Sequence, residues 1–359
     1  MNKKFTHKIR YKHAIWGVLL ALLVAKPCFA QKQKYTSACI AFYNLENLFD
    51  TIKSPDSDDA EFLPDGVNKW TAQRYELKQR NMASVIRKIG ADGLPEGPAI
   101  LGVAEIENRL VLEDLIKTPP LNELDYGIVH YDSPDARGVD VGLLYRKSHF
   151  SVLSSRTDRL TIKEMPGLRT RDQLVVSGLL DGELMHIIVM HWPSRRGGEK
   201  RSKPLRSSAA TLCRSIVDSL YSADANAKII IMGDFNDDPN NASLTKILKA
   251  RPSVEKTEKG GLYNTMYRWF KNGVGSLAWN DSWNLFDQII VSEPLLGKDF
   301  TTYKFYKSGV FNKDFLTQKE GRYAGYPLRT YSGGTFTGGY SDHFPTYIYL
   351  MRQLAEDSK

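Results

Sequence analysis

The chain passes from apolar to polar residues in the run Lys228-Ile229-Ile230-Ile231-Met232-Gly233-Asp234-Phe235-Asn236. The β-branched part predicts a strand that is buried on at least one face. Read alone, the polar part is typical of a strand-to-loop turn, because Asp and Asn favour local hydrogen bonds. The run therefore predicts a buried strand that ends either in a turn or in a functional site.

Similar apolar runs recur along the chain and alternate with helical patterns. The further predicted strands span residues 39–43, 99–104, 141–145, 184–190, 288–291 and 346–350. Two amphipathic helices are expected, one over residues 82–89 before Gly90 and one over residues 205–220 after Pro204. Alternating strands and helices indicate an α/β layered domain.

Residues 1–30 have the layout of a secretory signal peptide, with a basic start, an apolar run over residues 14–25 and Cys28-Phe29-Ala30 at the end. The apolar run is too short to cross the hydrocarbon core of a membrane. We expect cleavage after Ala30, a periplasmic or secreted protein and no stable membrane anchor. Lys26 and Pro27 stand where a lipid-anchored form would need small residues.

The remaining chain is expected to form one domain over residues 31–352, because no Pro/Ser-rich linker divides it, with a frayed tail at residues 353–359. Polar stretches at 51–69, 194–206 and 252–282 are expected as surface or site-forming loops. Cys39 and Cys213 lie in apolar patterns and are expected as buried free thiols rather than a disulfide. No feature indicates an obligate protein partner.

The positive charge of the chain lies largely in the predicted signal peptide. Residues 1–30 hold six of the 49 Lys and Arg residues and no Asp or Glu, so cleavage lowers the formal net charge from +8 to +2. The basic balance is therefore no footprint of a nucleic-acid-binding protein as a whole. Any basic binding surface must be local.

Polar residues occupy the ends of several predicted strands. Asn44, Glu105, His191 and Asp234 each stand at the carboxyl end of a predicted strand. Asp287 and the pair Asp342-His343 stand just before other strands. Antiparallel neighbours bring the start of one strand beside the end of another, so all these positions can line one edge of a mixed sheet. Such convergence is what an active site needs.

The chemistry of these groups favours phosphoryl transfer over acyl transfer. Glu105 with Asn44 offers the hard oxygen ligands that Mg²⁺ takes, with Mn²⁺ or Ca²⁺ as alternatives. Two imidazoles, those of His191 and His343, can serve proton transfer on opposite sides of a phosphorus centre. Asp287 can hold one of them in the right tautomer. No Gly-x-Ser-x-Gly run and no zinc-spaced Cys/His set competes with this interpretation.

Each residue taken singly also has a simpler interpretation. His191 alone is more often a structural histidine, and Glu105 alone can pair with Arg109. Asp342-His343 alone can be the start of a strand. Their joint occurrence at one sheet edge is what favours a site.

These residues resemble the motifs of the endonuclease/exonuclease/phosphatase superfamily, which includes pancreatic deoxyribonuclease, bacterial sphingomyelinases and inositol-polyphosphate 5-phosphatases. The similar runs are Phe42-Tyr43-Asn44-Leu45-Glu46-Asn47, Val103-Ala104-Glu105-Ile106-Glu107-Asn108, His191-Trp192-Pro193-Ser194, Gly233-Asp234-Phe235-Asn236, Phe286-Asp287-Gln288-Ile289-Ile290 and Ser341-Asp342-His343-Phe344-Pro345. In this order and spacing the set is highly specific and spans nearly the whole mature chain. The chain looks like a secreted bacterial-type member.

The resemblance implies a fold and a mechanism. The fold is a four-layer α/β/β/α sandwich of two mixed β-sheets packed face to face with helices outside, so residues 31–352 would be the catalytic domain. The mechanism is in-line attack of water on phosphorus. The implied metal ligands are Asn44, Glu105 and Asp342. The implied catalytic residues are His191 as the leaving-group acid, Asp234 or His343 as the base, Asn236 on a phosphate oxygen, and Asp287 orienting His343. Asp140 is a looser candidate as the partner of His191.

The substrate is open between three classes. A cationic loop at residues 194–206, with Arg195 and Arg196 as candidate substrate-binding residues, favours a nucleic acid, DNA or RNA. Aromatic and basic residues interleave between Tyr303 and Tyr331, a mixture that suits base stacking, packing on the core, or contact with lipid headgroups. A phosphatase or phospholipid phosphodiesterase is the alternative to a nuclease, and an inactive binding protein on the same fold is the third reading.

Overall fold

The computed structural model describes residues 34–55, 57–94 and 96–354. The predicted signal peptide and residues 355–359 of the predicted tail lie outside these residues. Residues 36–353 form the unit treated below, and its last strand continues through Gln353. In the described part of the chain no helix has the length and apolar character needed to span a membrane.

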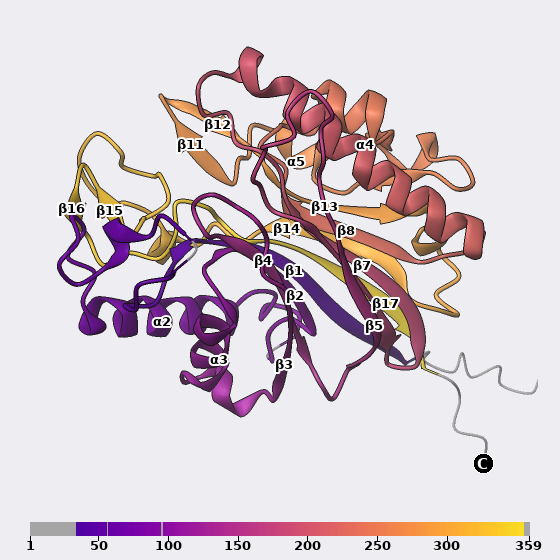
Figure 1. Ribbon diagram of the computed structural model, residues 1–359. Coiled ribbons are helices and arrows are strands. Elements are labelled where there is room, and N and C mark those ends of the chain that lie inside the picture. Colours follow the sequence, from indigo (N-terminus) through magenta and orange to yellow (C-terminus); the bar gives the residue numbers. More distant parts are fainter. Residues whose placement is uncertain (1–33, 56, 95, 355–359) are drawn as a thin grey trace, which may run out of the picture. The chain divides into compact units, whose positions relative to one another are not determined.

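Two large sheets carry the fold (Figure 1). The first has the order β14 (Lys304–Val310), β17 (Thr346–Gln353), β1 (Tyr35–Leu48), β2 (Ile100–Ile106), β4 (Asp140–Arg146) and β3 (Tyr126–His130). The second has the order β5 (Phe150–Asp158), β6 (Gln173–Leu180), β7 (Glu183–His191), β8 (Ile229–Asp234), β13 (Asp287–Ser292), β10 (Leu262–Asn264) and β9 (Ala250–Arg251). Both are mixed, since β1 pairs with β2 and β7 with β8 in parallel, and β4 and β13 pair antiparallel.

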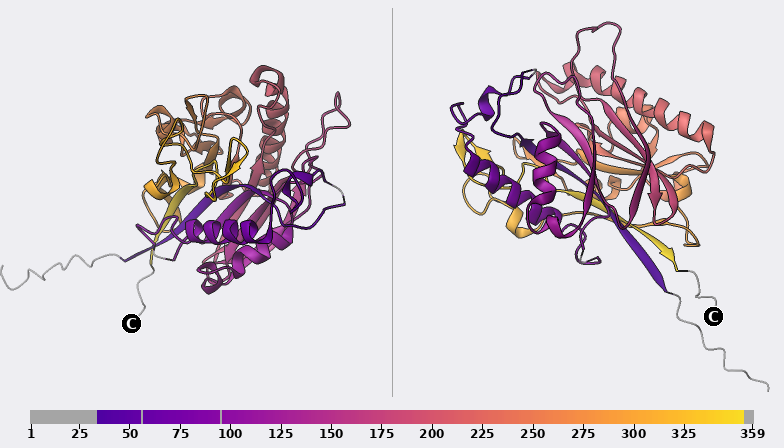
Figure 2. Two further views of the ribbon diagram at one scale, coloured as in Figure 1. Left: turned by 90° about the vertical axis from the view of Figure 1, so that its left-hand side faces the viewer. Right: turned by 60° about the horizontal axis from the view of Figure 1, so that its bottom comes forward.

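Helices cover the outer faces of the two sheets (Figure 2). Helices α2 (Ala72–Ile86) and α3 (Arg109–Lys117) pack on the first sheet, and α4 (Glu199–Ala223) packs on the second. The short helix α5 (Tyr267–Lys271) follows β10. Single turns occur at Ala60–Phe62, Leu121–Glu123, Ser243–Ile247, Val254–Lys256, Glu293–Leu295 and Asp314–Leu316. The predicted α/β class and four-layer sandwich are confirmed.

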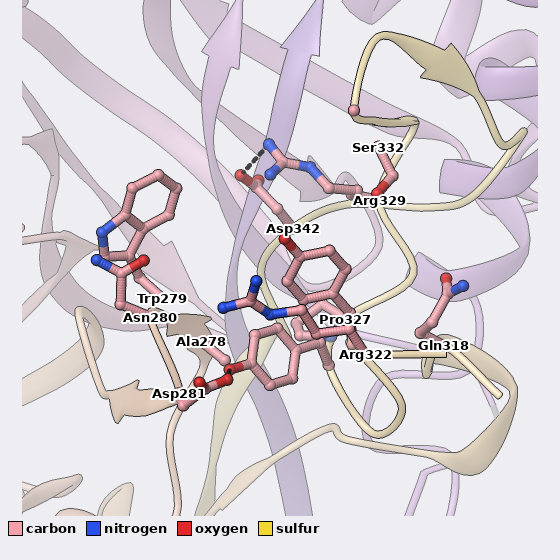
Figure 3. A pocket seen from close by; sticks show the side chains of 13 residues that line it. Ala278, Trp279, Asn280, Asp281, Gln318, Arg322, Pro327, Arg329, Ser332 and Asp342 are labelled. Carbon is pink, nitrogen blue, oxygen red and sulfur yellow. Dashed lines mark hydrogen bonds and ion pairs between the residues drawn. The ribbon is translucent and has the colours of Figure 1, made fainter. Parts of the chain in front are cut away.

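Two small hairpins stand outside the sheets. They are β11 (Leu277–Trp279) with β12 (Ser282–Asn284), and β15 (Tyr331–Ser332) with β16 (Thr335–Phe336). The turn of the first hairpin and the segment 318–333 line one hollow, which Asp342 also borders (Figure 3). Because Asp342 precedes β17, these additions lie beside the edge at which the polar residues were expected.

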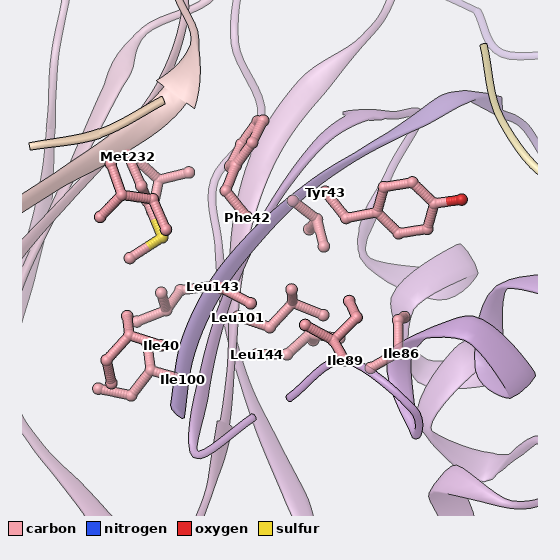
Figure 4. Close-up of a cluster of buried hydrophobic side chains, with 14 of the residues drawn as sticks. Ile40, Phe42, Tyr43, Ile86, Ile89, Ile100, Leu101, Leu143, Leu144 and Met232 are labelled. Atoms are coloured by element: carbon pink, nitrogen blue, oxygen red, sulfur yellow. The ribbon is translucent and has the colours of Figure 1, made fainter. Parts of the chain in front are cut away.

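Alternation along β8 explains why its apolar run is unbroken. Ile230 and Met232 face the first sheet, whereas Ile229 and Ile231 belong to the apolar layer beneath α4. A strand covered on both faces needs apolar residues at every position. The sheets approach closely at Gly102, where a Cβ atom would lie 2.6 Å from Met232 Sδ. Figure 4 shows the apolar side chains between the two sheets, beside Met232, and those between the first sheet and α2, beside Ile86.

All seven predicted strands are confirmed. The predicted helix over residues 205–220 lies within the longer α4, whereas the one over residues 82–89 only overlaps α2, which begins at Ala72 and ends at Ile86. The structure adds α3 and six strands of the two sheets, among them β5 and β14, whose exposed polar residues hid them. The predicted loop 252–282 is wrong in part, because β10 and α5 lie within it. Cys39 and Cys213 are free and buried, as expected.

The predicted loop at residues 194–206 is also wrong in part, because α4 begins at Glu199. A buried ion pair lies within these first turns. Arg206 is completely buried and its Nε lies 2.7 Å from Asp237 Oδ1, while Nη1 donates to Ser202 Oγ at 2.9 Å. Arg206 is therefore a structural residue and not part of a cationic binding loop.

We expect Asp237→Ala to lower the free energy of unfolding by about 3–5 kcal/mol, because it leaves the Arg206 charge buried without its partner. Denaturant unfolding measures the change. Arg80→Ala is the matched control, since Arg80 pairs with Glu76 at 3.6 Å with both side chains more than half exposed, and a change within about 1 kcal/mol is expected there. Equal losses in the two variants would contradict this account.

Candidate active site

Strand register brings the predicted residues of the second sheet to one level. His191 is paired with Asp234 across the parallel strands β7 and β8, and Asp287 is paired with Asp234 across the antiparallel strands β8 and β13. In the first sheet, Asn44 of β1 pairs with Ala104, directly before Glu105. These two edges meet, because Asn44 Nδ2 donates to Asp234 Oδ2 at 3.2 Å.

Asp234 lies at the centre of the site and is buried. Its Oδ2 atom is 3.5 Å from His191 Nε2 and 4.0 Å from His343 Nε2. Burial raises the pKa of Asp234 to about 7, with His343 opposing the shift and Asp287 adding to it. A carboxylate with this pKa exchanges a proton near neutral pH, which suits acid–base work.

A chain of hydrogen bonds orients His343. Its Nδ1 atom is 2.6 Å from Asp287 Oδ2, and Ser276 Oγ donates to the same oxygen. The backbone N–H of His343 donates to Ser341 Oγ at 3.1 Å. Burial lowers the pKa of His343, but the carboxylates of Asp287, Asp342 and Asp234 outweigh burial and raise it well above the ordinary value. The imidazole therefore presents Nε2 to the site.

His191 lies on the other side of Asp234. Its Nε2 atom is 3.8 Å from Glu105 Oε1, and its Nδ1 atom has no hydrogen-bond partner among the described residues. Burial, followed by the positive charge of Arg171, lowers the pKa of His191 well below the ordinary value. Asp140 is not its partner, since Asp140 accepts from His130 Nε2 at 3.0 Å on β3. That candidate pairing was wrong because β3 supplies a nearer histidine.

Two hydrogen bonds hold Asn236 in place, one from its backbone N–H and one from its side-chain amide. Its N–H donates to Asp234 Oδ1 at 2.9 Å, and its Nδ2 donates to the carbonyl of Trp192 at 3.0 Å. Its φ of 50° lies in the left-handed region, which Asn tolerates better than most residues. The side-chain amide has two N–H groups, so one donor stays available for a phosphate oxygen.

Glu105 protrudes from β2 at a strained position. Its φ is 58°, which coincides with a register shift between β2 and its neighbours. Glu105 Oε2 accepts from the backbone N–H of Asn47 at 3.1 Å, and Oε1 lies 3.6 Å from Arg137 Nη2. Arg109 is not its partner, because Arg109 pairs with Glu113 at 2.9 Å. Strained residues of this kind cluster at functional sites.

A charge network that sequence reasoning missed holds Asp342. Arg329 Nη2 donates to Asp342 Oδ2 at 2.9 Å, and Arg329 Nε donates to Glu46 Oε1 at 3.1 Å. The fully buried Lys78 lies 3.5 Å from Glu46 Oε2 and donates to Thr330 Oγ1 at 2.7 Å. Glu46 sits in the motif around Asn44, but its partners come from α2 and from residues near 330. Only the fold reveals them.

The donor atoms fit a hard divalent cation. Carboxylate and amide oxygens of Glu105, Asp342 and Asn44 are the ligand types that Mg²⁺, Mn²⁺ and Ca²⁺ share. Asp234, Asp287 and His343 also place ligand atoms within 4.8 Å of one another, but the hydrogen bond between His343 and Asp287 occupies Nδ1. Asn44 Oδ1 likewise accepts from the backbone N–H of Glu46 at 2.9 Å, and Asp342 Oδ2 accepts from Arg329 at 2.9 Å. The division of these residues into metal ligands and acid–base groups therefore stays a prediction.

The two predicted substrate-binding arginines differ in how far they are bonded to the rest of the protein. Arg195 is held within the protein, because its Nε donates to the Asn236 carbonyl at 2.9 Å and its guanidinium lies 4.5 Å from the centre of the Phe286 ring. It also reaches Asp237 and Asp238, both at 3.4 Å. Arg196 is exposed. Arg195 thus supports the loop that carries Asn236, and a substrate-binding role for Arg196 stays a prediction.

Solved structures of similar fold cover most of the chain. An endonuclease/exonuclease/phosphatase family protein of Bacteroides thetaiotaomicron is 16% identical with a TM-score of 0.54, covering 90% of this chain and 100% of its own. A mannosyl-6-phosphatase of the same species is 17% identical with a TM-score of 0.52, covering 87% and 99%. D. rerio TDP2 complexed with single strand DNA product is 15% identical with a TM-score of 0.51, covering 88% and 99%.

No curated protein matches the sequence. A family model, however, matches residues 39–352, which includes every residue of the site. Members of this family are metal-dependent hydrolases that act on phosphoesters, in agreement with the donor set around Asp234. The chain belongs to the Endonuclease/Exonuclease/phosphatase family.

Proposed function

We propose that the chain is a Mg²⁺-dependent phosphoesterase that hydrolyses phosphodiester bonds by in-line attack of water. One observation carries this proposal, namely that His191 and His343 approach the same buried carboxylate oxygen, Asp234 Oδ2, at 3.5 Å and 4.0 Å. Two imidazoles around one carboxylate can act on two sides of a reacting phosphorus.

The attacking water is proposed to sit between Asp234 and His343. The 4.0 Å from Asp234 Oδ2 to His343 Nε2 is too long for a direct hydrogen bond and suits a water that contacts both atoms. The proton of this water passes to the pair, and the hydrogen bond to Asp287 stabilises the positive imidazole. The two groups titrate together, so the pair as a whole acts as the base.

His191 is proposed to face the leaving oxygen. Because its lowered pKa keeps the imidazole neutral near neutral pH, it donates a hydrogen bond to that oxygen rather than the proton that the sequence-based mechanism assigned to it, and the leaving oxygen takes its proton from water. The imidazole has no tight hydrogen bond to either neighbouring carboxylate, since its Nε2 lies 3.5 Å from Asp234 and 3.8 Å from Glu105. The free N–H of Asn236 is proposed to hold a phosphate oxygen. Glu105, Asp342 and Asn44 would hold the cation, which when bound would neutralise charge on the phosphoryl oxygens.

Nucleic acid is the proposed substrate, and a periplasmic or secreted location is proposed from the signal peptide. The first turns of α4 and the loop before it support this choice, because they carry exposed cations close to His191 in the chain. These are Arg196, Lys200, Arg201 and Lys203. The single strand DNA product bound by D. rerio TDP2 agrees with a polynucleotide. A small organic phosphate is the second candidate, supported by the enclosed hollow beside Asp342 and by the mannosyl-6-phosphatase of similar fold.

We expect Asp234→Asn to lower kcat/KM about 10²–10⁴-fold, as loss of a general base does, while the protein becomes more stable. Burial disfavours the charged carboxylate, so a neutral amide removes that cost. In EDTA the gain in Tm over wild type should grow as the pH rises from the ordinary pKa of 3.8 toward about 7, and then level off.

The assay uses single-stranded oligonucleotides, plasmid DNA, sugar phosphates and sphingomyelin, with Mg²⁺ and with EDTA. His149→Ala is the control, since this histidine pairs with Asp181 away from the site. Full activity in EDTA, or a loss of stability together with activity in Asp234→Asn, would argue against the mechanism.

A variant in which the four exposed cations of α4 and its preceding loop become glutamine tests the nucleic-acid proposal. We expect log kcat/KM on oligonucleotides to depend less steeply on log salt, because each lost phosphate contact removes about 0.9 from the slope on duplex and about 0.7 on single strands. Asp234 and the histidines are unchanged in this variant. It should therefore still hydrolyse a small phosphate ester whose ring carries no charge.

The control variant replaces four exposed lysines near β9. They are Lys246, Lys249, Lys256 and Lys259. An equal change of slope in both variants would show a general charge effect and would reject the α4 surface as the nucleic-acid contact.

A further inference from the structure

A cavity of about 350 Å³ adjoins the active site on the side of Asp342. Its walls come from the β11–β12 hairpin, from residues 318–333 and from Asp342, which Arg329 contacts. Because Asp342 Oδ1 lies only 3.9 Å from His343 Nε2, the cavity lies next to the proposed acid–base group. A substrate whose phosphate reaches His343 therefore extends into this cavity or passes beside it.

Aromatic rings line the cavity without being part of the core. Trp279 is 67% exposed and Tyr323 is 47% exposed, values far above those of the core aromatics. Tyr326 is positioned by its hydroxyl group, which donates to Asp281 Oδ1 at 2.9 Å, and its ring lies 5.6 Å from that of Tyr323. Exposed rings on a fixed support cost stability in water and mark a surface that binds a ligand.

Arg322 adds an unpaired cation. Its guanidinium lies 5.7 Å from the centre of the Tyr323 ring, and it makes no hydrogen bond or ion pair with any residue in the described part of the chain. Asn280, Asp281 and Gln318 supply amide and carboxylate groups at the same hollow. Figure 3 shows Trp279, Arg322 and Asp342 around it.

We propose that this cavity receives an unpaired nucleobase next to the scissile phosphate, which makes the enzyme selective for single-stranded nucleic acid. The inference rests on the proposed phosphodiesterase function. Aromatic faces with an arginine are how proteins bind the bases of single strands, and amide and carboxylate groups can read the edge of a base. A base inside a duplex is stacked and paired, so it must leave the helix before it can enter.

The test compares three substrates of equal length: a single-stranded oligonucleotide, the same strand with an abasic site beside the scissile phosphate, and the duplex. Wild type is expected to cleave the intact single strand about tenfold faster than the other two. Trp279→Ala and Tyr323→Ala should each lower kcat/KM on the intact strand by about tenfold, the size of loss that follows removal of one base–aromatic stack. Their rates on the abasic strand should stay at the wild-type value.

Controls separate this inference from the general function. Trp279→Phe keeps an aromatic face and should retain most of the selectivity, and Tyr306→Ala removes a 55% exposed ring from β14 outside the cavity. If wild type cleaves both single strands equally and Trp279→Ala changes neither, the nucleobase proposal fails while phosphodiesterase activity stands. If sugar phosphates are cleaved and Trp279→Ala lowers that rate, the cavity binds another ring. No cleavage of any ester would reject the function itself.

Discussion

The hydrogen bond from Asn44 Nδ2 to Asp234 Oδ2 joins the ends of two central strands that belong to different sheets. β1 lies within the first sheet and β8 within the second, so this contact exists only when the sheets pack face to face in one arrangement. The close approach at Gly102 and the interlocking of Met232 with the first sheet set that arrangement. The active site is thus an outcome of how the apolar core packs.

The packed sheets bring several acidic side chains close together, and their negative charges repel one another. Asp234, Asp287 and Glu46 are buried, and the partly exposed Glu105 and Asp342 lie beside them. Like charges at short range destabilise each other. The structure responds in two ways. Lys78 and Arg329 neutralise Glu46 and Asp342, and the proton held by His343 stabilises Asp287. The charge left around Glu105 and Asp234 is what a divalent cation would offset.

The segments that surround this centre are less regular than the sheets. The β11–β12 hairpin and residues 318–333 carry exposed rings and Arg322, which forms no ion pair with the residues that the structure describes. Helix α4 contributes both a structural arginine, Arg206, and exposed cations. The two sheets therefore position the residues around Asp234, and these peripheral segments shape the surface beside them. Binding residues in many proteins lie on loops that a rigid scaffold positions, and the substrate contacts proposed above lie on segments of this kind.

The sequence alone was enough to predict the strands and site residues that a short stretch of chain makes recognisable. Apolar runs predicted seven strands, and the polar residues that follow or precede them named Asn44, Glu105, His191, Asp234, Asp287 and His343, because a strand end is visible in a short stretch of chain. Strands such as β5 and β14 were not predicted, because exposed polar residues interrupt their apolar pattern.

Tertiary structure decided which residues far apart in the chain become partners. Arg329 meets Glu46 across 283 positions, His191 lacks the partner expected in Asp140, and Arg206 is buried against Asp237 instead of facing solvent. Such pairings depend on which surfaces the core brings together, and no short-range pattern contains that information.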